Sequence, residues 1–381
     1  MRVMISCGEP SGDLYAGALA AEIRRLDPAG AITGFGGDRL AAAGATLVGD
    51  FSGLSVTGLL EVVRLLPRTY AVYRRLLADA DQARPDVFVA IDFPDFNFRL
   101  ARALKGRGVP IVYYISPQLW AWRAGRMQTM RRLVDRVLVI FPFEEPIYRN
   151  AGVPVQWVGH PLLDVQPMRA PRKVFLGSLG LDASRPVLAL LPGSRANELR
   201  EILPGLARAA RIIGDRVSGG QFVVARAPHL RDDLFAPLRE LERGSTTVVT
   251  TEGHTDDVLA SADAAVVASG TVTVQAALHE CPMVVVYRLS PLTYRLGKPF
   301  VRVDTYAMAN LVAGRRVVPE LIQDAFTPDA VAEEATRMLT DHAYASRIRA
   351  GLREVKNKLG EPGASQRAAA AVLEVAGIRA T

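Results

Sequence analysis

The stretch Asp86-Val-Phe-Val-Ala-Ile-Asp-Phe-Pro-Asp-Phe-Asn97 changes character halfway along. Its first half, Val87–Ile91, is an unbroken apolar run, which is typical of a parallel strand covered on both faces. Its second half holds two carboxylates, an amide and a proline that ends the strand. Ligands of open α/β sheets bind just outside the carboxyl ends of the strands, so Asp92 and Asp95 are expected where a substrate would lie. The competing interpretation is that Asp92 only caps a helix at 96–105.

Short apolar runs alternate with helical segments on both sides of this stretch. In the first half of the chain, the further strands are expected at 3–7, 32–35, 109–115, 136–140 and 155–158. A segment at 159–171 with three prolines and no periodicity is typical of a linker. After it, strands are expected at 186–191, 222–225, 247–250, 263–268 and 283–287. This alternation predicts an α/β fold with two Rossmann-like, doubly wound domains.

Size and composition set the outer bounds. A chain of 381 residues is too long for one ordinary core, so we expect two domains, at 1–165 and 166–342. The net charge of +7 suggests an anionic partner. Phosphorylated small molecules or an anionic membrane surface fit better than nucleic acid, since no basic run with interleaved aromatics and no zinc or RNA-recognition motif occurs. Two cysteines, no signal peptide and no apolar run of membrane-spanning length indicate a cytoplasmic protein.

The loop Gly8-Glu-Pro-Ser-Gly-Asp13 follows the first expected strand. Gly8 and Gly12 allow a tight turn and close approach of a ligand at a helix N-terminus. The GxGxxG fingerprint of dinucleotide binders is not met. Glu9 and Asp13 would repel phosphate, so the loop favours binding of sugar hydroxyls.

Two further segments of the first half are candidates for lipid or sugar contact. The segment 59–77 is apolar on more than one face and has arginines interspersed, which fits either a buried helix or a helix lying on anionic headgroups. The candidate membrane residues are Leu59, Val62, Val63, Leu65 and Leu66. The segment Ser116-Pro-Gln-Leu-Trp-Ala-Trp-Arg123 offers Trp120, Trp122 and Arg123 as the floor of a sugar or acyl site.

The second half has two turns suited to phosphate. After the strand at 186–191, Gly193 and Ser194 can present backbone amides, and Arg195 adds a guanidinium with bidentate geometry. After the strand at 263–268, Ser269, Gly270 and Thr271 stand at a helix N-terminus. Two such turns in one domain predict a nucleotide-diphosphate pocket. His160, at the start of the linker, has either a structural or a catalytic role.

These motifs together resemble the lipid-A-disaccharide synthase family of GT-B glycosyltransferases (glycosyltransferase family 19) over essentially the whole chain. The motifs are Gly8-Glu-Pro-Ser-Gly-Asp13, Ile91-Asp-Phe-Pro-Asp-Phe-Asn97, Ser116-Pro-Gln-Leu-Trp-Ala-Trp-Arg123, Leu191-Pro-Gly-Ser-Arg195, Ser269-Gly-Thr271 and Asn310-Leu-Val-Ala-Gly-Arg315. The resemblance implies transfer from UDP-2,3-diacylglucosamine to 2,3-diacylglucosamine 1-phosphate (lipid X), with inversion at the anomeric carbon. It also implies two domains that face a cleft, and we consider whether the helices of 343–381 cross back to the first domain.

The resemblance also distributes roles among the candidate residues. Asp92 is the expected base for the acceptor's 6-hydroxyl, and Asp95 is the second candidate. Glu9 is the third residue expected at the catalytic centre. The other residues expected on the acceptor side are Ser11, Gly12, Asp13, Asn97, Trp120, Trp122 and Arg123. The residues expected on the donor side are Gly193, Ser194, Arg195, Glu198, Ser269, Gly270, Thr271, Gln275, Asn310 and Arg315. No cofactor or metal is expected, and UDP is expected to leave without a metal ion.

One departure from the family pattern concerns Gln275, where family members usually carry Glu to hold the ribose hydroxyls. Gln can accept one hydrogen bond and donate another. Gln275 leaves open a non-catalytic nucleotide- or lipid-binding paralogue. The fold leaves open a UDP-sugar epimerase, which also uses two such halves. The resemblance implies a peripheral position on the cytoplasmic face of the inner membrane, as a monomer or a homodimer.

Overall fold

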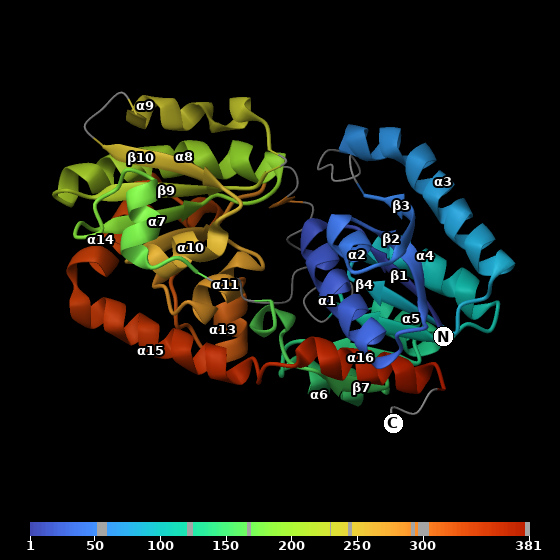
Figure 1. Ribbon diagram of the computed structural model, residues 1–381. Helices are drawn as coiled ribbons and strands as arrows, with labels where there is room; N and C mark the ends of the chain where they lie inside the picture. The colour runs from blue at the N-terminus through green and yellow to red at the C-terminus, as the bar shows by residue number, and fades with distance from the viewer. Residues whose placement is uncertain are drawn as a thin grey trace. The chain divides into compact units, whose positions relative to one another are not determined.

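The chain forms two units, each built around one parallel sheet (Figure 1). The first unit comprises Met1–Val165 and Leu359–Thr381, and the second comprises Gln166–Lys358. The structure is a computed structural model that describes residues 1–51, 59–119, 125–165, 169–228, 230–242, 246–290, 294–295 and 305–377. The expected α/β class with two Rossmann-like sheets is confirmed.

The first sheet has seven strands in the order β3-β2-β1-β4-β5-β6-β7. Their bounds are β1 Arg2–Cys7, β2 Ala31–Gly36, β3 Thr46–Asp50, β4 Val87–Ile91, β5 Ile111–Tyr114, β6 Arg136–Val139 and β7 Val155–Trp157. The chain steps outward from β1 to β3 and then returns to place β4 on the other side of β1, with Cys7 opposite Ile91. The strand order therefore reverses between β1 and β4, which is where open α/β sheets bind ligands.

Helices cover both faces of the first sheet. Their bounds are α1 Pro10–Leu26, α2 Asp38–Ala42, α3 Leu59–Gln82, α4 Pro94–Lys105, α5 Arg126–Leu133, α6 Glu144–Asn150, a short 3-10 helix Pro161–Leu163 and α16 Ala364–Val375. On one side α3, α4 and α5 follow one another over a core that contains Met4, Phe35, Leu76 and Phe88. On the other side α1 packs against α2 and against α16. Pro67 lies inside α3, which continues through it as one helix.

The end of the chain divides between the two units. The sequence leaves open whether the helices of 343–381 return to the first half. In the structure α15 (His342–Lys358) belongs to the second unit and α16 to the first. The Asp164 carboxylate fixes the start of α16 within the first unit. It accepts hydrogen bonds from the backbone amides of Gly363 (2.6 Å), Ala364 (3.3 Å) and Ser365 (2.7 Å). A charged acceptor at the start of a helix satisfies amides that otherwise have no partner.

The second sheet has six strands in the order β10-β9-β8-β11-β12-β13. Their bounds are β8 Val187–Leu191, β9 Gln221–Arg226, β10 Thr247–Glu252, β11 Ala264–Ala268, β12 Met283–Tyr287 and β13 Glu320–Ile322. Here the order reverses between β8 and β11, which pair in parallel with Leu191 opposite Val267. The two turns expected to bind phosphate follow these two strands.

The helices of the second unit connect its strands. Their bounds are α7 Arg172–Ser178, α8 Ala196–Arg216, α9 Arg239–Glu242, α10 Thr255–Ser261, α11 Val272–Leu278, α13 Met308–Ala313, α14 Pro328–Thr340 and α15, with 3-10 helices at Asp232–Leu238 and Gln323–Ala325. α8 packs against α14, and α10 packs against α7 and α11. α13 is a short helix that contains Asn310, and its residues Met308, Ala309 and Val312 are buried.

Candidate functional site

In the first unit, the loop after β1 and the turn after β4 lie against each other. A Cβ on Gly8 would stand 2.3 Å from the ring of Phe93, so the loop passes this close only because residue 8 is glycine. The structure therefore brings the Gly8–Asp13 motif and the Asp92–Asn97 motif together at the point where the strand order reverses.

The turn after β4 has an unusual backbone. Asp92 and Phe93 have φ values of 44° and 48°, so two consecutive residues with side chains occupy the left-handed region. Such residues typically cost on the order of 1–3 kcal/mol each, and they cluster at functional sites. The N-cap of α4 is Phe93, not Asp92. Asp92 is therefore not the helix cap that the competing interpretation made it.

Two side chains hold this turn by its backbone. The carbonyl oxygen of Asp92 accepts hydrogen bonds from the Tyr113 hydroxyl (2.8 Å) and from the Asn97 side-chain nitrogen (2.8 Å). The Asn97 oxygen in turn accepts a bond from the Ser6 hydroxyl (2.7 Å). Asn97 was expected to bind substrate, but it is fully buried and its amide is occupied within the protein. Its observed role is to position the Asp92 turn.

Asp95 lies one helical turn into α4 and points elsewhere. Its carboxylate accepts a hydrogen bond from the Arg126 guanidinium of α5, and its side chain is 72% exposed. An oxygen already engaged by a guanidinium is a poor acceptor for a substrate proton. Between the two candidates for the base, this contact favours Asp92, which is partly buried.

The remaining residues of the first loop divide into a rim and a support. Glu9 is the N-cap residue of α1, and Glu9 and Ser11 are partly exposed, whereas Gly12 is buried. Asp13 is 4% exposed, and its carboxylate accepts hydrogen bonds from the backbone amides of residues 37, 39 and 40 at the start of α2. The expectation that Asp13 lines a sugar site is thus corrected to a helix-capping role.

In the second unit, the turn after β8 is closed by its own glutamate. The Glu198 carboxylate accepts hydrogen bonds from the amides of Ser194 (3.1 Å) and Arg195 (3.3 Å). Gly193 has a φ of 117°, and a Cβ there would lie 2.5 Å from that carboxylate. We expected these amides to face a diphosphate. In this structure the Glu198 carboxylate binds the two amides instead. Arg195 is exposed, so its guanidinium is more accessible to a ligand than these amides.

The turn after β11 presents small polar residues. Gly270 and Thr271 are exposed, and the Ser269 hydroxyl donates to the carbonyl of Tyr306 (3.0 Å). Gln275 lies one turn into α11 and is partly exposed. Burial raises the pKa of Tyr287, at the end of β12, with a smaller contribution from Glu198. Because β8, β11 and β12 are parallel neighbours, their carboxyl ends lie at the same edge of the sheet.

Two of the expected donor-side residues have other partners. The Asn310 amide is 2% exposed; it donates to Glu320 (2.7 Å) and accepts from the amides of Val317 and Val318. Arg315 forms an exposed ion pair with Glu354 (2.6 Å). The Asn310 amide ties α13 to the segment at 317–320, and Arg315, just after α13, pairs with α15.

Some expected residues fall outside what the structure describes. Trp120, Trp122 and Arg123 belong to the range 120–124, which is not described. α3 includes Leu59, Val62, Val63 and Leu65, but their side chains are also outside the described set. The side chain of Leu66 is described and is 51% exposed. Tyr70, one turn later, is 61% exposed. From Val72 onward, α3 packs into the core through Val72, Leu76 and Ala80.

His160 has a structural role. It is 1% exposed, and its Nδ1 accepts a hydrogen bond from the amide of Leu162 (3.2 Å). Burial lowers the pKa of His160 to about 3. The imidazole therefore stays neutral at physiological pH and caps the 3-10 helix Pro161–Leu163.

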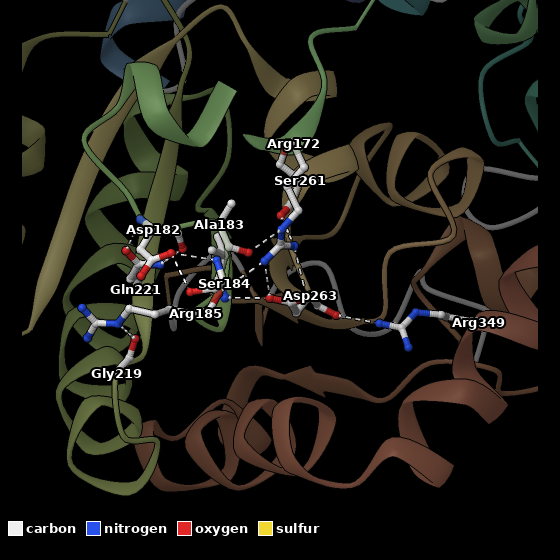
Figure 2. A network of polar contacts seen from close by, with 11 residues as sticks. Arg172, Asp182, Ala183, Ser184, Arg185, Gly219, Gln221, Ser261, Asp263 and Arg349 are labelled. Atoms are coloured by element: carbon white, nitrogen blue, oxygen red, sulfur yellow. Dashed lines mark hydrogen bonds and ion pairs between the residues drawn. The ribbon is translucent and has the colours of Figure 1, made fainter. Parts of the chain in front are cut away.

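The amino ends of the strands in the second unit form a different kind of polar cluster, shown in Figure 2. The Asp263 carboxylate, just before β11, accepts two hydrogen bonds from the Arg172 guanidinium (3.0 and 3.1 Å) and one from the Val187 amide (2.8 Å). Arg349 donates to the Asp263 carbonyl (3.2 Å). Bidentate pairing of this kind is geometrically specific and ties α7 and α15 to the sheet.

No group of three or more His, Cys, Asp or Glu side chains in the described chain is arranged to hold a metal ion. None of the helices in the described ranges is long and apolar enough to cross a membrane.

Comparison with solved structures defines the fold. UDP-GlcNAc 2-epimerase from Neisseria meningitidis, bound to UDP-GlcNAc, superposes with a TM-score of 0.69 at 13% identity and covers 98% of this chain and 100% of the other. The calicheamicin glycosyltransferase CalG4 superposes with a TM-score of 0.60 at 18% identity, covering 98% of each chain. The architecture is therefore the GT-B type shared by glycosyltransferases and epimerases.

Comparison of sequences defines the family. The model of the lipid-A-disaccharide synthetase family matches residues 3–375. Lipid-A-disaccharide synthase from Geobacter sulfurreducens is 45% identical over 379 residues, covering 99% of this chain and 97% of that relative. The chain belongs to the lipid-A-disaccharide synthetase family, and it is a glycosyltransferase of lipid A biosynthesis. The epimerase alternative is not favoured.

Proposed function

We propose that this enzyme transfers a 2,3-diacylglucosaminyl group from UDP to the 6-hydroxyl of lipid X. The observation that supports this most is the strained turn at Asp92, which puts a carboxylate where the strand order of the first sheet reverses. In such sheets that position is the usual ligand site. The turns at 193–195 and 269–271 occupy the equivalent position in the second sheet.

The chemical step is a direct displacement with inversion. The Asp92 carboxylate takes the proton of the acceptor's 6-hydroxyl. At the same time the oxygen of that hydroxyl forms a bond to the anomeric carbon of the donor. The bond from that carbon to the phosphate oxygen breaks, and UDP leaves with the electron pair. A positioned base contributes typically about 10² to 10⁴ in rate.

The leaving UDP develops negative charge that needs stabilisation. Arg195 is the proposed guanidinium donor, assisted by Ser269, Gly270 and Thr271. Glu198, which now occupies two amides of the same turn, would compete with a diphosphate for them. Gln275, one turn into α11, is the proposed partner of the ribose hydroxyls.

A peripheral position on an anionic membrane surface is part of the proposal, because both substrates carry acyl chains. It is supported by Leu66 and Tyr70, which are large, apolar and exposed on the same side of α3, one turn apart. Arg68, Arg74 and Arg75 are also exposed in this stretch, as suits contact with anionic headgroups. We also propose that the protein is cytoplasmic and that it acts as a monomer or a homodimer.

The deciding experiment is a product assay with both lipid substrates, with and without a chelator. We expect disaccharide 1-phosphate and UDP in equal amounts, whether or not the chelator is present. A second incubation contains UDP-N-acetylglucosamine alone. Epimerised sugar in that incubation, with no disaccharide in the first, would overturn the proposal.

The membrane part has its own test. Replacing Val63, Leu65 and Leu66 by serine should release the protein from vesicles that contain phosphatidylglycerol, because apolar side chains lose their insertion energy. Co-sedimentation measures this. Unaltered binding rejects α3 as the membrane contact and leaves the transfer reaction untouched.

A further inference from the structure

A shallow hollow lies between α4 and α5 of the first unit, beside the Asp92 turn. Its lining includes Asp95, Phe98, Arg99, Arg102, Arg126 and Thr129. Asp95, Arg99 and Arg102 recur at intervals of four and three residues, so they share one face of α4. The hollow begins at Pro94, two residues beyond Asp92.

The guanidinium groups of this hollow are not equivalent. Arg126 is bound to the Asp95 carboxylate, and its guanidinium carbon lies 5.8 Å from the centre of the Phe98 ring. Arg99 and Arg102 are both exposed, and neither has a hydrogen-bond or ion-pair partner among the described residues. One carboxylate therefore faces three guanidinium groups, and the lining has a net charge of +2.

This charge and geometry suit a phosphate monoester. A monoester is close to a dianion at neutral pH and offers three strong acceptor oxygens. Guanidinium groups bind phosphate with paired, directional hydrogen bonds. The Thr129 hydroxyl can donate one further hydrogen bond. A phosphodiester headgroup carries a single charge and would leave one of the two unpartnered guanidinium groups without compensation.

We propose that this hollow binds the phosphate monoester of the glycosyl acceptor and so holds the acceptor with its hydroxyl toward Asp92. The inference rests on the proposed function, since it assumes a phosphorylated sugar acceptor. It adds Arg99 and Arg102 as specificity-determining residues that none of the sequence motifs contains.

The test uses the double variant Arg99→Ala/Arg102→Ala of the full chain. With lipid X as acceptor, KM for the acceptor should rise at least about tenfold, because two charge-assisted hydrogen bonds are lost. The value of kcat and KM for the UDP-sugar should change less than about twofold. With the same acceptor lacking its 1-phosphate, the variant and the parent protein should give equal KM values.

A matched control removes the same charge nearby. Arg131 and Arg132 are exposed on α5 but do not line the hollow, so Arg131→Ala/Arg132→Ala should keep the parent KM for lipid X. Equal KM changes in both double variants would show a general charge effect and overturn the proposal. A loss of binding to phosphatidylglycerol vesicles with an unchanged KM for lipid X would overturn it too, in favour of a headgroup site.

A binding measurement separates this inference from the reaction itself. The ³¹P signal of a short-chain diacylglucosamine 1-phosphate should broaden with the parent protein, in the absence of donor, and stay sharp with the double variant. Broadening without any turnover would support the hollow while refuting the proposed reaction. Equal broadening with both proteins would refute the hollow whatever the turnover.

Discussion

Two aspartates at the ends of strands have opposite surroundings. Asp92 follows β4 with a left-handed backbone, and its main-chain carbonyl is held by Tyr113 and Asn97. Asp263 precedes β11, and its carboxylate is itself held, by Arg172 and by the amide of Val187. At Asp92 the protein fixes the backbone, and at Asp263 it fixes the side chain.

This difference underlies the proposed distinction between a base at Asp92 and a structural carboxylate at Asp263. Hydrogen bonds to the Asp92 carbonyl fix its main chain, at the expense of local strain. Hydrogen bonds to the carboxylate of Asp263 stabilise its charged form and join three elements of the second unit. Substitutions at the two positions should therefore affect different measurements.

The largest expected effect is on turnover. Asp92→Asn removes the proposed base and should lower kcat by about 10² to 10⁴ with no loss of folded protein, as judged by circular dichroism. Asp95→Asn is the matched control, and it should lower kcat less than tenfold because Asp95 is already paired with Arg126. Full activity of Asp92→Asn would remove the base assignment, and a reversed order of the two variants would transfer it to Asp95.

The next effect is on stability at the other aspartate. Asp263→Asn weakens the bonds to Arg172 and should lower the free energy of unfolding by about 1–3 kcal/mol, a range reduced by partial exposure of both side chains. Urea unfolding measures this. Activity per folded molecule should stay at the parent value, and a fall in kcat comparable to that of Asp92→Asn would erase the distinction drawn above.

A smaller effect is expected from the hydroxyl that holds the Asp92 turn. Tyr113→Phe deletes one hydrogen bond of about 0.5–1.5 kcal/mol, so kcat should fall roughly two- to tenfold while KM stays constant. Phe88→Leu, a change in the same core cluster that does not touch the hollow, is the control for packing alone. If both variants lower kcat equally, the hydroxyl has no special positioning role.

The last effect concerns acid stability and lies outside both aspartates. The pKa of His160 is about 3 in the folded protein and near 6.5 when unfolded, so the unfolded chain binds the proton more readily between these values. Stability present above pH 6.5 should therefore be lost as the pH falls, by at most about 1.4 kcal/mol per pH unit. His160→Gln should show a shallower slope between pH 6.5 and 5 in urea unfolding. Parallel slopes would contradict a neutral buried imidazole.

Strongly apolar strands were predictable from the sequence. β4 and β12 have the expected bounds, because five consecutive apolar residues flanked by breakers leave little choice. β3 and β13 were missed, since an edge strand such as Thr46–Asp50 has a half-buried, mixed pattern, and Glu320–Ile322 is only three residues long. Arg126 was also missed, because its partner Asp95 lies 31 residues away.

By itself, the sequence determined the α/β class, the two sheets and the motif positions at strand ends, because apolar runs, glycines and prolines act on their immediate neighbours. Only the tertiary structure decided which polar side chain serves which purpose. Asn97 and Asn310 are residue types that often contact ligands, yet folding surrounds them with backbone groups and with the side chains of Ser6 and Glu320. A buried amide must satisfy its hydrogen bonds wherever the fold supplies them, and that supply comes from residues distant in the chain.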